Sequence, residues 1–333
     1  MRWQDFRRSD NVDDRTDGAP EGSAGGGGFG GGFPGGGGFR IGGGALVVIV
    51  IASLIFGVNP LEMLGLIGGG GGPVSQAPQA PPGYGPQNQP GPGQAAPGYG
   101  PQHAPAPGPP PPGTGRRQDA SHDFVTAILG DTEDVWGAVF KAQGLQYQRP
   151  KLVLFRGSTE SKCGGASGMA SAATGPFYCS VDREVYLDTS FFSELARRFG
   201  APGEFAQAYV IAHEVGHHVQ NLTGTMRKVD QAMQRQDARG RNALSVRLEL
   251  QADCYAGVWG YFANKRGVLD PGDLESGFRA ASAVGDDQIQ KRTQGYVVPE
   301  SFTHGSAEQR THWFKVGLES GDMRKCDTFA AQG

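Results

Sequence analysis

The chain has 333 residues and a formal net charge of −3, and it contains 56 Gly and 23 Pro. Of these, 32 Gly and 18 Pro fall in residues 1–120. A segment so poor in large apolar side chains cannot bury enough surface to offset its ordering entropy, which excludes one globular domain over the whole chain. The near-neutral charge gives no indication of a nucleic-acid partner, so we expect none.

Composition divides the chain into four parts. Residues 1–40 mix five Arg with six acidic residues among many Gly, and we expect a disordered head. Residues 41–67 are predicted to be a transmembrane anchor, and residues 68–120 a tether rich in Pro, Gly and Gln. Residues 121–333 are long enough to form one folded domain with a sizeable core.

The anchor is predicted from the absence of charge between Arg40 and Glu62 and from the apolar run at 45–58. The 18 residues 41–58 meet the lower limit for a spanning helix. A buried core helix would need a core that the flanking Gly- and Pro-rich tracts do not supply, and a cleaved signal peptide would start earlier. No basic residue follows until Arg116, which favours a single-pass membrane protein with a cytoplasmic N-terminus and an extracytoplasmic domain.

The tether carries Pro-Gly-Tyr-Gly-Pro-Gln twice, at 82–87 and 97–102. Such a composition is typical of chain that is partly polyproline II and partly flexible, and it would hold the domain away from the bilayer. Binding of a cell-wall or protein partner by the repeats is the alternative.

All four cysteines lie in the last part of the chain, and none forms a Cys-x-x-Cys metal motif. Disulfides in an oxidising compartment are the expected state, with four buried free thiols as the alternative. Of three possible pairings, Cys163 with Cys179 would close a local loop rich in Gly and Ser. Cys254 and Cys326 would then tie the C-terminal tail to a central helix.

Apolar spacing predicts two short strands and then a series of helices. The strands are expected at 151–156 and 184–188, and a helix precedes them at 121–144 with a pause at 130–132. Further helices are expected at 189–199, 203–222, 242–265, 270–284 and 306–320. This order predicts an α+β fold that is mostly helical, with a small sheet backed by helices.

The pattern His-Glu-x-x-His occurs once, at His213, Glu214 and His217, within a helical run that contains no Pro. Two histidines four residues apart lie on one face of a helix, so both imidazoles can bind one metal ion. Glu214 is turned by about 100° from His213, which suits a general base beside the ion and not a ligand. Gln220 and Thr223 stand where the metzincin extension would have Gly and His, which excludes that class.

A third ligand is expected from the helix that contains Glu249 and Asp253, again four residues apart. Glu249 would complete a His₂Glu site for one Zn²⁺ per chain with water in the fourth position. Asp253 would accept a hydrogen bond from a ligand histidine and so fix its tautomer. The alternative is an exposed acidic pair, while Asp230 and Asp237 are weaker ligand candidates.

The sequence resembles a family, the putative neutral zinc metallopeptidases of bacteria, which are membrane-anchored zincins. The resemblance covers the N-terminal segment, the Gly-rich head, the anchor and nearly all of 121–333. It implies a gluzincin-like peptidase domain at 121–333 that acts on a peptide or protein substrate. The stretches that carry it are Met1–Gln4, Ser9–Asp14, Gly175–Cys179, Ala208–Asn221, Glu249–Gly257 and Ser301–Ser306.

Several other polar residues are candidates for lesser roles. His304 could donate a hydrogen bond to the developing oxyanion, as a His or Tyr does in many zincins, or else cap the last helix or lie at the surface. His218 is expected near the site or in the core, and His312 and Tyr209 in packing roles. The pair Asp286-Asp287 either begins a helix or binds a cation.

The function expected is hydrolysis of a peptide bond by a metal-activated water, with Glu214 as the base and His304 as an oxyanion donor. Two alternatives remain open. One is a noncatalytic envelope protein in which zinc is structural and the chain recruits partners. The other is amide hydrolysis on peptidoglycan by the same metal chemistry.

Overall fold

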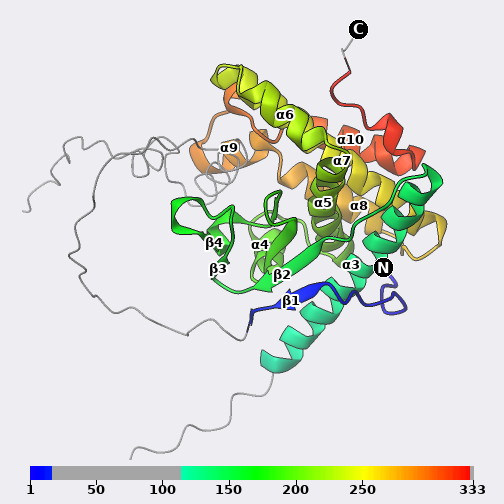
Figure 1. Ribbon diagram of the computed structural model, residues 1–333. Coiled ribbons are helices and arrows are strands. Elements are labelled where there is room, and N and C mark those ends of the chain that lie inside the picture. Colours follow the sequence, from blue (N-terminus) through cyan, green and yellow to red (C-terminus); the bar gives the residue numbers. More distant parts are fainter. Residues whose placement is uncertain (17–113, 331–333) are drawn as a thin grey trace, which may run out of the picture.

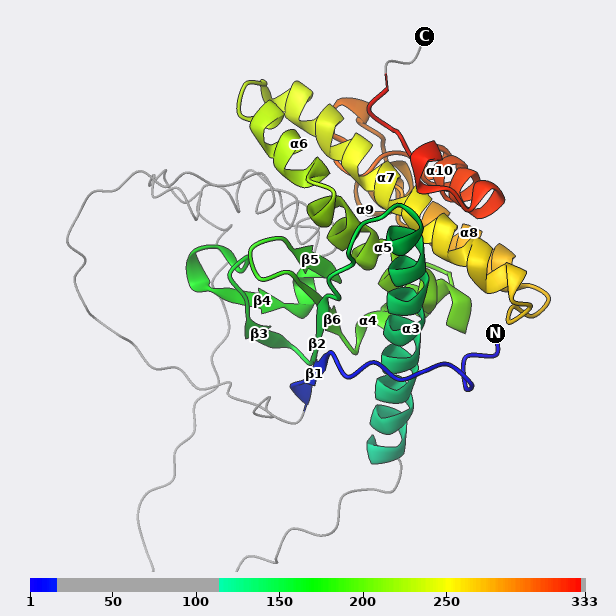
Figure 2. The same ribbon diagram turned by 45° about the vertical axis from the view of Figure 1, so that its right-hand side comes forward.

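The structure is a computed structural model that describes residues 1–16 and 114–330. A small sheet lies on one side of a group of helices, and helix α5 lies between the sheet and helix α7 (Figures 1 and 2). Helices α8 and α10 pack on the far side of α5 and α7. The predicted α+β class, mostly helical with a small sheet, is confirmed.

Four strands form the main sheet, in the order β1 (Val12–Asp14), β2 (Lys151–Phe155), β6 (Glu184–Asp188) and β5 (Phe177–Cys179). The first three are parallel, and β5 runs antiparallel to β6. A separate antiparallel hairpin is made by β3 (Ser158–Glu160) and β4 (Met169–Ser171).

The sheet is buried on both faces, which explains the continuous apolar run of β2. Leu152 and Leu154 belong to the main core, whereas Val153 and Phe155 belong to a smaller cluster on the other face. Successive side chains of a strand point to opposite faces, so both faces need apolar residues. The predicted strands at 151–156 and 184–188 therefore coincide with the centre of the sheet.

Eight helices are described in these two ranges. Those predicted from apolar spacing are all present with shifted ends. The start of α9 was one of the two alternatives at Asp286-Asp287, while α6 and the strands β1, β3, β4 and β5 were not predicted. The helices are α3 (Thr114–Ala142), α4 (Phe191–Arg197), α5 (Glu204–Leu222), α6 (Thr225–Met233), α7 (Ala238–Lys265), α8 (Asp273–Ala283), α9 (Asp286–Gln294) and α10 (Ala307–Ser320).

Helix α10 packs against α7 at an unusually short distance. A Cβ added at Gly317 would overlap the Cys254 carbonyl oxygen, and one added at Gly257 would overlap the Phe314 carbonyl oxygen. The two backbones can approach this closely only because both positions are glycine. The tail beyond α10 is then attached to α7 by the Cys254–Cys326 disulfide.

Both expected disulfides are confirmed. The second, Cys163–Cys179, closes a loop that contains β4 and attaches the segment after β3 to β5. No free cysteine remains among the described residues.

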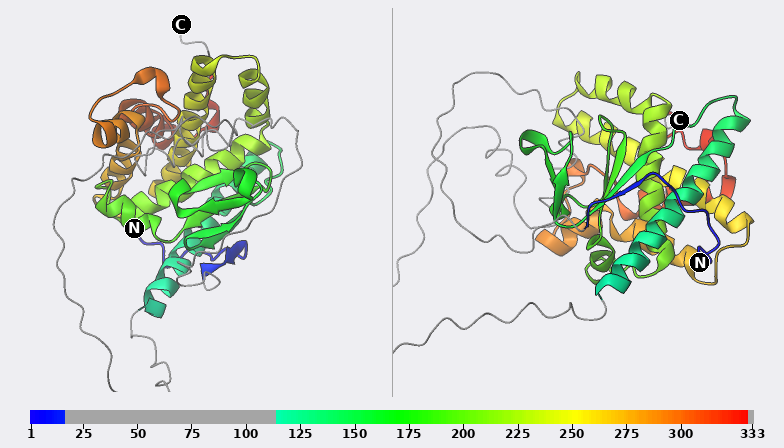
Figure 3. Two further views of the ribbon diagram at one scale, coloured as in Figure 1. Left: turned by 90° about the vertical axis from the view of Figure 1, so that its left-hand side faces the viewer. Right: turned by 60° about the horizontal axis from the view of Figure 1, so that its bottom comes forward.

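The prediction of a disordered head at 1–40 is wrong for residues 1–16. They cross α3 and end in β1, beside β2 (Figures 2 and 3). Trp3 and Phe6 pack against the main core. A three-residue strand containing two Asp has no apolar period, so only its pairing with β2 reveals it. Residues 17–40 lie outside the described residues.

Helix α3 also differs from its prediction, since it starts inside the predicted tether and continues through Gly130-Asp131-Thr132. The Thr132 hydroxyl donates to the Leu129 carbonyl at 2.7 Å. This hydroxyl is therefore hydrogen-bonded within α3 and does not cap a new helix. None of the described helices is long and apolar enough to cross a membrane. The predicted anchor at 41–67 and the tether up to residue 113 lie outside the described residues.

Candidate metal centre

Helix α5 presents the His-Glu-x-x-His residues inside the protein. Its residues are buried almost continuously from Phe205 to Gln220. Gly216 lets it approach α7, because a Cβ there would lie 2.9 Å from the Ala252 carbonyl oxygen and 3.2 Å from the Ala252 Cα. This close approach brings the α5 histidines next to the acidic face of α7.

His213, His217 and Glu249 come together at this contact. Their potential ligand atoms all lie within 4.8 Å of one another. The Nε2 atom of His213 is 3.2 Å from one Glu249 carboxylate oxygen, and the Nε2 atom of His217 is 3.5 Å from the other. All three residues are buried.

These distances fit zinc. Ligand bonds of about 2.0–2.1 Å in a tetrahedral site put neighbouring ligand atoms roughly 3.3 Å apart, which matches the two His–Glu separations. Both histidines use Nδ1 for hydrogen bonds to protein groups, so both Nε2 atoms are directed at the shared position. With three protein ligands, a zinc ion would retain an open fourth position, as catalytic sites do.

A buried ionic network orients His213. Its Nδ1–H donates to Asp253 Oδ1 at 2.8 Å, and the hydroxyl of Tyr209 donates to the same oxygen at 2.5 Å. Arg310 donates from Nε and Nη2 to the two Asp253 oxygens, both at 2.9 Å. Burial lowers the pKa of His213, but Asp253 outweighs burial and brings this pKa to about 10. A metal at Nε2 must therefore compete with a proton.

His217 is oriented by neutral amides instead. Its Nδ1–H donates to Gln220 Oε1 at 2.8 Å, and the Gln220 amide nitrogen donates to the Leu248 carbonyl at 2.7 Å. Gln220 also donates to Gln251, which in turn donates to the Cys326 carbonyl at 2.8 Å. The disulfide-bonded tail thus supports the second histidine through two glutamines.

Glu214 is buried beside the two histidines and is not part of the ligand group. Burial raises the pKa of its carboxyl above the ordinary value, while the neighbouring imidazoles oppose this rise. Burial also acts to raise the pKa of Glu249, yet His217 and His213 hold that pKa well below its usual range. The two carboxyls are thereby distinguished: Glu249 suits a ligand, and Glu214 suits a group that gains and loses a proton.

His304 lies in the turn before α10, with one ring nitrogen held and the other free. Its Nδ1 is 3.1 Å from Asp286 Oδ1 and 3.0 Å from the Thr303 hydroxyl. Its Nε2 is buried without a hydrogen-bond partner. Burial lowers the pKa of His304, but the Asp286 carboxylate outweighs burial and raises it. The charge of Glu249 contributes to the same rise in the pKa of His304.

Asp286 begins helix α9, one of the two roles considered for the Asp286-Asp287 pair. Its Oδ2 accepts the backbone N–H groups of Thr303 and His304, both at 2.7 Å, and of Gly305 at 3.1 Å. One carboxylate therefore fixes both the backbone of this turn and the ring of His304.

The remaining sequence candidates lie away from the ligand group. His218 accepts from the Tyr178 hydroxyl and donates to the Gln148 carbonyl, and burial lowers its pKa to about 4, so it is a neutral core residue. Asp230 lies in α6, and Asp237 caps α7 by accepting the Gly240 N–H.

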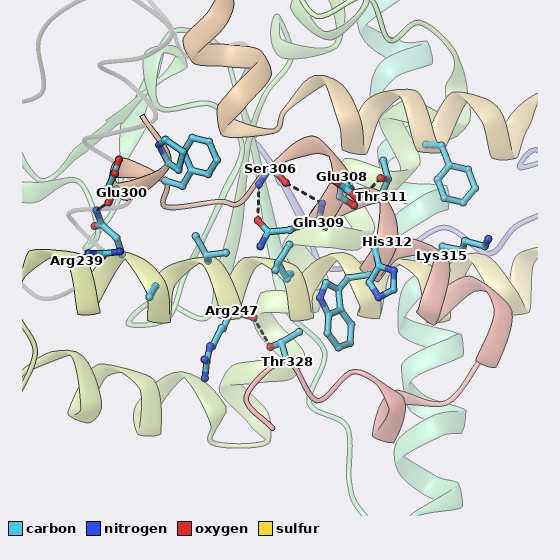
Figure 4. Close-up of a pocket in the computed structure, with 18 residues that line it drawn as sticks. Arg239, Arg247, Glu300, Ser306, Glu308, Gln309, Thr311, His312, Lys315 and Thr328 are labelled. Carbon is cyan, nitrogen blue, oxygen red and sulfur yellow. Dashed lines mark hydrogen bonds between the residues drawn. The ribbon is translucent and has the colours of Figure 1, made fainter. Parts of the chain in front are cut away.

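A groove of about 1160 Å³ lies between α7, the segment before α10 and α10 itself (Figure 4). His312 is one of its lining residues, with basic side chains from Arg239, Arg247 and Lys315. Phe302 and Ser306 line it on either side of the His304 turn, whereas none of the three candidate ligands does. Ser306 and Gln309 form the capping box that starts α10 at its wall.

Sequence reasoning missed Arg310, Gln220 and Gln251. Arg310 stands in an otherwise amphipathic run at 306–320. An arginine there is only weak evidence for a buried role, because most arginines lie at surfaces. For the two glutamines the sequence offered no signal, since an amide side chain is common on any helix.

Comparison with known proteins agrees with this site. The family described as putative neutral zinc metallopeptidase matches residues 1–94 and 100–329 of the chain. An uncharacterized protein, YpfJ of Escherichia coli strain K12, is 43% identical over 331 residues, which is 99% of each chain. Another, Rv2575 of Mycobacterium tuberculosis strain H37Rv, is 46% identical over 219 residues, or 62% of this chain and 72% of that one.

No solved structure matches the chain. The family match extends over the N-terminal segment, both ligand helices and the His304 turn. The chain belongs to the putative neutral zinc metallopeptidase family.

Proposed function

We propose that the protein is a membrane-attached zinc peptidase that hydrolyses peptide bonds with an activated water. The observation that carries this proposal is the joint placement of the three ligand side chains, 3.2 and 3.5 Å apart, with Glu214 buried beside them. A structural zinc site has no need of an additional, non-ligating carboxyl group beside its ligands.

Zinc bound by His213, His217 and Glu249 would supply Lewis acidity to a water molecule and to the scissile carbonyl. Glu214 accepts the proton of the attacking water and then passes it to the leaving amine. Its raised pKa suits both transfers, because a group that shuttles protons works best with a pKa nearer the working pH.

His304 stabilises the negative charge that develops on the carbonyl oxygen. Asp286 holds the Nδ1 side of its ring, and the unpartnered Nε2 is available to donate. A preorganised donor of this kind costs no reorganisation when charge appears in the transition state.

Replacing His304 by Phe should lower kcat by about 10²–10³-fold, the usual effect of losing one oxyanion donor. KM and bound zinc should stay close to wild type, because the ring is not in the ligand group. Steady-state kinetics with metal analysis checks this. His312→Phe, in the exposed part of the groove, is the matched control, and equal kcat values for the two variants would remove His304 from the mechanism.

The proposed activity is tested with the purified full chain and a library of fluorescence-quenched peptides. We expect one zinc per chain, hydrolysis that is lost on chelation, recovery on adding one equivalent of zinc, and inhibition by a hydroxamate. Zinc binding without hydrolysis or hydroxamate inhibition would instead favour a noncatalytic envelope protein. Cleavage of peptidoglycan but not of peptides would favour the amide hydrolase alternative.

For localisation we propose attachment to the bacterial membrane through residues 41–67, with the zinc domain on the extracytoplasmic side. The uncharged run at 41–61 supports the attachment. The two disulfides support the compartment, because such bonds persist where the surroundings are oxidising.

A further inference from the structure

Residues 1–16 are paired with the domain through its central sheet. Strand β1 pairs with β2 in parallel, with Val12 opposite Leu152 and Asp14 opposite Leu154. The Leu152 N–H donates to the Asn11 carbonyl, and the Arg15 N–H donates to the Leu154 carbonyl, both at 2.8 Å. Without β1, strand β2 would expose an unpaired edge beside apolar side chains.

Polar contacts to α3 fix the stretch before β1. The buried carboxylate of Glu133 accepts Arg7 Nη2 and the Ser9 hydroxyl, both at 2.7 Å, and Asn11 Nδ2 at 2.8 Å. Within the described residues 114–330, the positively charged group near the Glu133 carboxylate is Arg149, whose Nη1 lies 3.9 Å from Glu133 Oε2. Nearby, Arg8 forms two hydrogen bonds to Asp123, at 2.6 and 2.9 Å. The hydrogen bonds and most of the positive charge that stabilise the buried Glu133 carboxylate therefore come from residues 1–16.

Shape complementarity accompanies these contacts. At Gly130 the Arg7 carbonyl lies so close that an added Cβ would overlap it. The Trp3 ring packs edge-on against Phe124, with centroids 5.3 Å apart. The amino group of Met1 lies 3.0 Å from Asp273 and 3.1 Å from Asp270. The segment is therefore an integral part of the domain and not an appended tail.

This docking conflicts with the topology expected from the sequence. A single crossing through residues 41–67 puts residues 1–16 and 114–330 on opposite sides of the membrane, where β1 cannot pair with β2. Exchange of the segment between two copies does not remove the conflict, because every copy with that topology has its N-terminal segment on the wrong side.

We infer that residues 1–16 and the zinc domain lie on the same side of the membrane, so that residues 17–113 leave and return to one face. Any number of membrane crossings within that segment is then even. The disulfides assign this face to the oxidising, extracytoplasmic side. A single crossing by the apolar run at 45–58 would separate the two halves of the fold and is therefore excluded by the pairing of β1 with β2. This inference is independent of peptidase activity.

Cysteine labelling tests the inference in intact spheroplasts that express the full chain. Asp10→Cys reports on the N-terminal segment and Glu275→Cys on α8, and both positions are exposed. We expect a membrane-impermeant maleimide to label both to the same extent without permeabilisation. Labelling of Asp10→Cys only after permeabilisation would overturn the inference. If both variants need permeabilisation, the same-side arrangement holds and the extracytoplasmic assignment is wrong.

A second measurement asks whether the segment is docked in the membrane-bound protein. Gly130 and Gly137 lie on the same helix, α3. A Cβ added at Gly137 would have no atom within 4 Å, so Gly137→Ala is the matched control for Gly130→Ala. In native membranes, Gly137→Ala should raise Tm by about 2 °C, whereas Gly130→Ala should lower it by about 5 °C. If both variants raised Tm equally, Gly130 would have no segment packed on it, and the inference would fail.

Discussion

A Glu214→Gln variant is expected to bind zinc as the wild type does and to lose its turnover. The amide keeps the shape of the carboxylate but cannot accept the proton of the attacking water, so kcat should fall by about 10²–10⁴-fold. Zinc stoichiometry should not change, because Glu214 is outside the ligand group. Peptide hydrolysis and metal analysis on the same samples check both parts.

Glu275→Gln is the matched control, since it makes the same chemical change at an exposed position in α8. It should leave kcat and zinc content at wild-type values. A Glu214→Gln variant that still cleaves peptides at the wild-type rate would show that Glu214 is not the base. One that loses zinc would instead show that it contributes to the metal site.

An Arg310→Met variant is expected to be less stable than wild type by about 3–5 kcal/mol, the usual effect of removing one partner from a buried ion pair. Arg310 is 4% exposed, and it neutralises the fully buried carboxylate of Asp253 through two hydrogen bonds. Zinc affinity should fall as well, because Asp253 orients His213. Denaturant unfolding and a zinc titration measure the two effects.

Lys315→Met is the control for Arg310→Met. Its partner Glu319 lies on the same helix, α10, and both side chains are well exposed, so the free energy of unfolding should stay near wild type. Adding Asp253→Asn to Arg310→Met should recover part of the lost stability by removing the unpaired charge. Full additivity of the two substitutions would contradict a coupled pair.

Much of the metal site could be predicted from the sequence because it rests on local geometry. Two pairs of residues four apart, His213 with His217 and Glu249 with Asp253, share a helix face in any α-helix. The structure brings both faces together, with Asp253 bonded to His213 and Glu249 opposite both histidines. Gly216 permits the close contact of α5 and α7 that makes this possible.

The groups that support the ligands could not be predicted in the same way. Arg310 and Asp286 lie on separate elements from the side chains that they orient. Gln220 shares α5 with His217 but is held by α7 through the Leu248 carbonyl. Nothing local distinguishes these three residues from surface residues. Their roles depend on which helices pack together. The same reason hid β1, whose partner strand lies more than a hundred residues later in the chain.

Composition and periodicity alone determined the folded C-terminal region, the mostly helical α+β class and the two helix faces that carry the candidate ligands, because each depends on residues close together in the sequence. The tertiary structure decided which groups orient those ligands. It also decided that residues 1–16 are part of the domain, where the sequence had indicated a disordered head beyond a membrane anchor. Long-range strand pairing and buried ion pairs leave no periodic trace in the chain, so these contacts appear only once the elements are packed.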